Sequence, residues 1–92
     1  MSGYDHDTLR WIGEMGYAAG CEFAQLEAQE GKQEGIFSQI AASFLVFAMT
    51  KGISVENETY KPFTREFLSG YMAEQCYEFE TGYGTNSIQA NS

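Results

Sequence analysis

Three residues near the start of the chain, Asp5, His6 and Asp7, have side chains of the types that bind metal ions. Adjacent residues on a helix point in different directions, so these three side chains cannot converge on one ion. A carboxylate that precedes a helix accepts hydrogen bonds from the free N–H groups of the first turn. We therefore expect Asp5 or Asp7 to cap a helix here, and we expect no metal site.

A second candidate for chemistry is the pair Glu27 and Glu30. With this spacing, two carboxylates on one helix can hold magnesium in small all-α nucleotide pyrophosphohydrolases. Such a site needs a second acidic set on a facing helix, which only Glu74, Glu78 and Glu80 could supply. It also needs basic or polar groups for the phosphates, and the chain has only five Lys and Arg. Magnesium-dependent nucleotide hydrolysis is therefore the third of our functional hypotheses.

The two cysteines do not predict catalysis. Cys21 and Cys76 lack the CxxC spacing of a zinc site, and His6 is the only histidine that could activate either thiol. The Gly82-Tyr-Gly84 stretch is not expected to follow a strand or precede a helix, as a phosphate loop does. We expect two reduced thiols, no cofactor, no metal and no enzymatic activity.

Acidic and aromatic side chains remain as candidates for binding a protein. On a helical wheel Trp11 falls about 110° from the centre of the first helix's apolar seam. Trp11 is therefore either an exposed anchor or a partly buried residue that closes the end of the bundle. Trp and Tyr are strongly enriched among interface hot spots. The predicted partner-binding residues, on the first and third helices, are Trp11, Glu14, Glu22, Glu74, Tyr77, Glu78 and Glu80.

Three helices must position these side chains, and the sequence predicts an all-α, small three-helix bundle with short polar connectors. We expect the helices at residues 5–29, 35–51 and 62–80, with Lys61-Pro62 starting the third. The stretch 36–49, IFSQIAASFLVFAM, is apolar nearly all round. It is shorter than the roughly 20 residues that a bilayer crossing needs. We therefore expect a buried second helix, central in the bundle between the other two.

Periodicity predicts which face of each flanking helix is buried. The first helix carries an apolar seam with steps of three and four residues. The third helix has a corresponding apolar face, and the face opposite it, which includes Gly70, is expected to point outward. The seam comprises Leu9, Ile12, Gly16, Ala19, Phe23 and Leu26, and the face comprises Phe67, Leu68, Tyr71, Met72, Cys76 and Phe79.

Small residues recur every four positions along the first helix, at Gly16, Gly20, Ala24 and Ala28. Each interior glycine costs about 1 kcal/mol of helix propensity relative to alanine, so this ridge needs a compensating contact. We expect the bulky side chains of the second helix to pack closely against it. The alternative is that Gly13 or Gly16 breaks the first helix into two pieces.

Composition bounds the number of domains and the class of partner. Ninety-two residues suffice for one domain, which we expect over residues 1–80, with a flexible polar tail over 81–92. The net charge of −8 disfavours direct contact with nucleic acid or anionic lipid and favours a partner with a basic surface. The start of the chain lacks the basic and apolar regions of a signal peptide, which favours a cytoplasmic protein.

These observations predict a protein that acts by binding another protein. The most concrete version is a stoichiometric inhibitor of a nucleic-acid-handling host defence protein, of the kind that phages and mobile elements encode, acting in the host cytoplasm. Only 20% of the residues are charged, which favours a protein-specific inhibitor over a full nucleic-acid mimic. The alternative hypothesis is a structural homo-oligomer, such as a homodimer, or an assembly adaptor that uses the second helix between chains.

Overall fold

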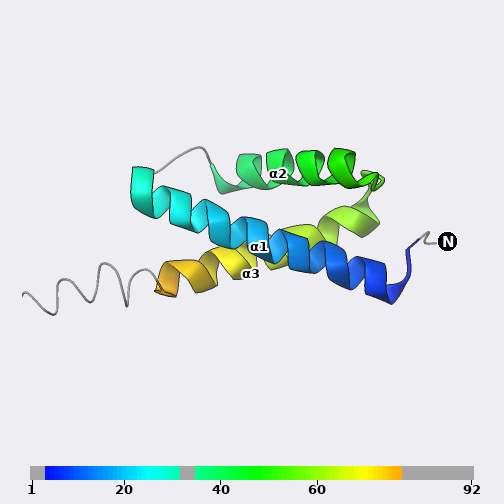
Figure 1. Cartoon of the computed structure of the whole chain (residues 1–92), viewed down its shortest axis with the longest axis horizontal. Helices are drawn as coiled ribbons and strands as arrows, with labels where there is room; N and C mark the ends of the chain where they lie inside the picture. The colour runs from blue at the N-terminus through cyan, green and yellow to red at the C-terminus, as the bar shows by residue number, and fades with distance from the viewer. Residues whose placement is uncertain (1–3, 32–34, 78–92) are drawn as a thin grey trace, which may run out of the picture.

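A computed structural model describes residues 4–31 and 35–77, and these residues form three helices without a strand (Figure 1). The helices are α1 (His6–Glu30), α2 (Ile36–Lys51) and α3 (Asn57–Tyr77). The predicted all-α three-helix bundle is confirmed. Helix α1 passes through Gly13 and Gly16 without interruption, so the alternative of a broken first helix is wrong. The predicted tail, residues 81–92, lies outside the described residues.

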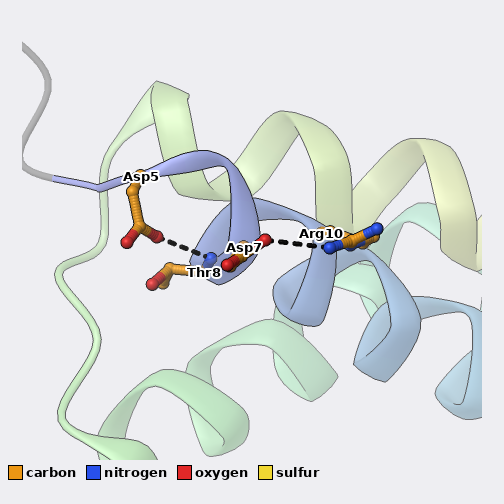
Figure 2. A network of polar contacts seen from close by, with 4 residues as sticks. All are labelled: Asp5, Asp7, Thr8 and Arg10. Carbon is orange, nitrogen blue, oxygen red and sulfur yellow. Dashed lines mark hydrogen bonds and ion pairs between the residues drawn. The ribbon is translucent and has the colours of Figure 1, made fainter.

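Helix α1 begins at a side-chain cap, as the sequence predicts. The backbone N–H of Thr8 donates to a carboxylate oxygen of Asp5 over 2.8 Å (Figure 2). In the same turn Arg10 pairs with Asp7 at 2.8 Å, and both side chains are exposed. The hydrogen bonds from Thr8, chiefly that of its backbone, lower the pKa of Asp5 below its ordinary value.

This cap predicts a pH-dependent contribution to stability. Because the pKa of Asp5 is lower in the folded chain, the contribution is fully present above the ordinary carboxyl pKa of about 3.9 and is lost as the pH falls through the lower pKa of the folded chain. Replacing Asp5 with alanine should therefore lower the melting temperature at pH 7 and have a much smaller effect at pH 2. Asp5→Asn, which keeps an oxygen acceptor, is the control and should stay close to the wild type at pH 7. Equal losses for Asp5→Ala at both pH values would contradict the cap.

Helix α2 ends at Lys51, the residue that the sequence predicts, and a glycine follows it. Gly52 adopts a left-handed conformation (φ 72°, ψ 31°), which only glycine enters without a steric penalty. The N–H of Ile53 donates to the carbonyl oxygen of Ala48 at 2.9 Å, and the Ile53 side chain packs against the core. These are the hydrogen bond and the apolar contact of a Schellman turn.

Helix α3 begins five residues earlier than predicted, and Pro62 lies inside it. The residue that organises this start is Thr59, whose side chain is fully buried. Its hydroxyl lies 2.7 Å from the carbonyl oxygen of Ser54 and 2.9 Å from that of Glu56, and it accepts a bond from the N–H of Glu56. Pro62 is tolerated because it removes a single hydrogen bond close to the helix start. The proline therefore does not mark the boundary.

Helices α1 and α3 run in the same direction and pack directly on each other, which corrects the prediction that the second helix lies between them (Figure 1). The small residues of α1 make this contact. A methyl group added to Gly16 would come within 2.9 Å of the Cα atom of Phe63, and one added to Gly20 would come within 2.9 Å of the Phe67 carbonyl carbon. The backbones can approach this closely only because glycine has no side chain.

The contact is reciprocal, because Gly70 of α3 lies against the backbone of Tyr17. Gly70 was predicted to point outward and is instead buried. The ridge of α1 thus packs against α3. The prediction that it packs against the bulky side chains of α2 is wrong. Glycines carry almost no hydrophobic signal, so periodicity alone could not assign the buried face of α3.

Helix α2 lies beside the α1–α3 pair (Figure 1). It contacts the pair through aromatic side chains. The ring of Phe44 lies 5.3 Å from that of Phe63 and 5.2 Å from that of Tyr60, both in edge-to-face arrangements. Phe47 stacks on Phe63 at 5.6 Å. These rings hold α2 further from its neighbours than α1 and α3 are from each other. The large buried side chains of the core are Ile12, Phe23, Ile40, Phe44, Phe47, Phe63 and Phe67.

Several residues predicted to be in the core are exposed. Leu26 at the end of the α1 seam is 37% exposed, and Met72 of α3 is 62% exposed. Cys76 is also exposed, and Phe79 lies outside the described residues. The buried side of α3 instead follows Thr59, Phe63 and Phe67. A threonine and a glycine on the buried side carry little hydrophobic signal, so periodicity alone rotated the predicted face.

Candidate protein-interaction surface

The structure places Trp11 at the edge of the core. Its ring packs against Phe47 of α2, with 5.3 Å between ring centroids and an interplanar angle of 59°. The side chain is half-buried. Of the two possibilities that the sequence left open, the structure favours the partly buried residue at the end of the bundle. Much of the indole surface is therefore already used in the intramolecular contact with α2.

Both predicted acidic partners of Trp11 on α1 are exposed. Glu14 is exposed and lies beside a cleft between α1 and α3, whereas Glu22 is exposed beside a groove between α1 and α2. On α3, Glu74 accepts a hydrogen bond from Gln25 at 3.2 Å. Of the remaining predicted residues, Glu78 and Glu80 lie outside the described residues, and the structure describes only the helical backbone of Tyr77.

The carboxylate of Glu27 is engaged by a tyrosine. The hydroxyl of Tyr71 donates to Glu27 over 2.6 Å and accepts a bond from Gln75 at 2.9 Å. Burial, and then the hydrogen bond to this carboxylate, raise the pKa of Tyr71 to about 12. Over residues 4–31 and 35–77, no three His, Cys, Asp or Glu side chains cluster in a way that could hold a metal ion.

The Cys21 thiol also has a structural contact. It lies 3.4 Å from the carbonyl oxygen of Gly70, at the close approach of α1 and α3. Burial raises the pKa of Cys21, and the carboxylates of Glu74 and Glu22 raise it further. A raised pKa lowers the thiolate fraction at neutral pH, which is the opposite of what activates a nucleophile.

An open cleft of about 840 Å³ lies along α1 and α3, and it gathers three of the chain's five Lys and Arg residues. Acidic side chains interleave with these cations, so positive and negative groups balance along the cleft. Arg10 and Arg65 keep more than 70% of their side-chain surface exposed, where ion pairs contribute little. We assign no ligand to this cleft. The charged groups that line it are His6, Arg10, Lys61, Arg65, Glu14, Glu58 and Glu66.

The most distinctive surface is the side of α2 that points away from the other helices, which corrects the prediction of a fully buried second helix. Met49 is 81% exposed, Phe37 is 68% exposed, Val46 is 65% exposed and Leu45 is 46% exposed. Ala41 and Ala42 are exposed between them. We call this surface the outer face of α2, and it comprises Phe37, Ala41, Ala42, Leu45, Val46 and Met49.

The outer face of α2 carries no charge. The one charged residue of the helix is Lys51, at its last position. A groove of about 450 Å³ between α1 and α2 adjoins the face, and its lining includes Ala18, Ala42 and Val46. Contiguous apolar patches are rare on monomeric proteins and mark interaction sites. The outer face of α2 is therefore a candidate functional site, in addition to the predicted acidic and aromatic residues.

Among the helices that the structure describes, none is both long and apolar enough to cross a membrane. The 16-residue α2 would span about 24 Å, short of a hydrocarbon core of roughly 30 Å. A comparison with known proteins finds no matching family model, no matching curated protein and no similar solved structure.

Proposed function

We propose that this protein functions as a helical homo-oligomer, in which two copies associate through the outer face of α2. The observation that supports this proposal is the exposure of four large apolar side chains along one uncharged helical face. A helix that is apolar on all sides is stable in water when every one of its sides is covered by other protein surface. Within residues 4–31 and 35–77, the fold of one chain covers only the face that carries Ile40, Phe44, Phe47 and Ala48.

Charge favours a second copy of the chain as the occupant. The acidic residues of the described chain lie on α1 and α3 or directly before these helices, and none lies on α2. A basic partner would gain no electrostatic attraction on the outer face of α2. An uncharged apolar surface matches another of the same kind, because neither side loses the solvation of a charged group on binding. The outer face of α2 itself is such a surface.

Two matched substitutions test this proposal. Ala41 on α2 and Ala73 on α3 are both exposed helical alanines, so glutamate at either position adds the same charge at little cost to packing within one chain. Ala41→Glu places that charge in the middle of the proposed interface, and the dimer dissociation constant should rise at least about 100-fold. Ala73→Glu should leave it unchanged. Sedimentation velocity measures the dimer dissociation constant of each variant, and equal changes in the two constants would contradict the proposal.

The ionic strength dependence gives a second test of the same proposal. Two copies that each carry a net charge of −8 repel, and salt screens this repulsion. Dimerisation should therefore strengthen between about 20 mM and 500 mM salt, concentrations at which the Debye length shrinks severalfold.

A second candidate function is the sequence-based one, a monomeric inhibitor that binds a basic protein of the nucleic-acid-handling kind. The observation that favours it is the exposure of the Glu14 and Glu22 carboxylates on a strongly acidic chain. Such binding would weaken as salt rises, since attraction between exposed charges is screened. The direction of the salt effect therefore separates the two functions.

A further inference from the structure

We infer that the two copies pair with their α2 helices antiparallel, around a two-fold axis that passes near Ala42 and Ser43. This inference rests on the proposed function and adds the orientation and register of the pair. Three features of the described chain favour it: the order of large and small side chains along the outer face, the dipole of α2, and the placement of charge at its two ends.

Large and small residues follow one another along α2 in an order suited to antiparallel pairing. Phe37 and Met49 stand near the ends of the face, with Ala41 and Leu45 between them. In the antiparallel register Phe37 lies opposite Met49 of the partner subunit, and Ala41 lies opposite Leu45 of the partner subunit. Ala41 then faces a large side chain, which allows close packing.

Parallel pairing would place each residue opposite itself. The two Phe37 rings would hold the helices apart, while the two Ala41 methyl groups would leave a gap between them. Antiparallel pairing places neither Phe37 nor Ala41 opposite its own copy. Two-fold pairing in either orientation makes the interface isologous, so the dimer closes and the outer face of α2 is not left free for a third copy.

Electrostatics favour the same orientation. Helix dipoles that lie side by side attract when they are antiparallel and repel when they are parallel. Lys51 ends α2, and the exposed Glu30 ends α1 close to the start of α2, since only residues 31–35 connect the two helices. Antiparallel pairing brings Lys51 toward the partner's acidic end. Parallel pairing would place the two Lys51 ammonium groups next to each other.

Cysteine cross-linking tests the orientation without removing any apolar residue of the face. Ser38 and Thr50 are exposed near opposite ends of α2, and each can be replaced by cysteine in the full-length chain that carries Cys21→Ser and Cys76→Ser. In the antiparallel pair, position 38 lies near position 50 of the partner, whereas the two copies of position 38 are about 15 Å apart along the axis. A short bis-maleimide should therefore link the mixture of Ser38→Cys and Thr50→Cys chains, and neither variant alone.

The outcomes separate this inference from the proposed function. Mixed products that outnumber both self-products support the antiparallel pair. Self-linked Ser38→Cys and Thr50→Cys chains would overturn the orientation but leave association through α2 intact. A third outcome is that sedimentation shows a dimer, but neither the mixed chains, nor either variant alone, nor an Ala42→Cys variant at the axis gives a cross-linked product. This outcome would overturn the orientation and show that the interface does not lie on α2. A monomer under all conditions would overturn the proposed function and this inference with it.

Discussion

Replacing Gly20 with alanine should destabilise the fold by about 3 kcal/mol or more, although alanine is the better helix former by about 1 kcal/mol. The added methyl group would lie within 2.9 Å of the Phe67 carbonyl carbon and of the Tyr71 backbone nitrogen. Both are backbone atoms, so no side chain can rotate away, and α1 and α3 must separate along the contact. Chemical denaturation followed by circular dichroism measures the loss.

Gly13→Ala is the matched control for this prediction, because Gly13 is also an interior glycine of α1. A methyl group there would meet the Cγ atom of Glu66 at 3.1 Å, and that flexible side chain can move. We expect Gly13→Ala to be neutral or slightly stabilising, since the gain in helix propensity is not offset by a backbone clash. Similar unfolding free energies for the Gly13 and Gly20 variants would contradict the close packing of α1 on α3.

Truncating Phe44 to alanine should cost about 3–5 kcal/mol of folding free energy. The side chain is 1% exposed, and its ring lies between those of Tyr60 and Phe63. Its loss would leave a cavity at the centre of the aromatic contact that holds α2 on the α1–α3 pair. Thermal or urea unfolding of the variant gives the value directly.

The same change on the opposite side of α2 should behave differently. Phe37 is 68% exposed, so Phe37→Ala should change the stability of the isolated chain by no more than about 0.5 kcal/mol. It should instead weaken dimerisation, because Phe37 lies in the proposed interface. The two variants should be compared at a concentration where the wild type is monomeric. Equal losses of folding stability would contradict the assignment of a buried and an exposed face to α2.

The local signals in the sequence were sufficient to predict much of the fold. Asp5 marks the start of α1, and Gly52 with Ile53 marks the end of α2, because both use short-range hydrogen bonds that depend on the residue type. The start of α3 was mispredicted because the buried hydroxyl of Thr59 bonds to the preceding loop, and a buried threonine has no distinctive pattern.

The long-range arrangement could not be predicted in the same way. The ridge at Gly16 and Gly20 indicates that some backbone approaches α1, but nothing in its spacing says which helix supplies it. The clue was Gly70, a single glycine within the third helix, whose reciprocal contact with Tyr17 becomes apparent only once the two helices are paired.

The outer face of α2 was not predicted as a candidate site, for a related reason. A helix that is apolar on all sides can be covered by its own chain or by another chain, and the sequence pattern is the same for both. In this fold α1 and α3 pack on each other, so together they cover only one side of α2. The acidic residues gave a more conspicuous signal, but Glu14 and Glu22 lie beside different depressions of the surface and Trp11 is packed against Phe47.

The molar mass of the unmodified protein in solution tests the central claim most directly. One chain has a mass of 10.3 kDa. Light scattering on samples from about 1 µM to about 1 mM covers the range of weak to moderate association. Association through the outer face of α2 predicts a mass that rises with concentration and levels off at twice the mass of one chain. A mass that stays at 10.3 kDa over the whole range, at low and at high salt, would contradict it.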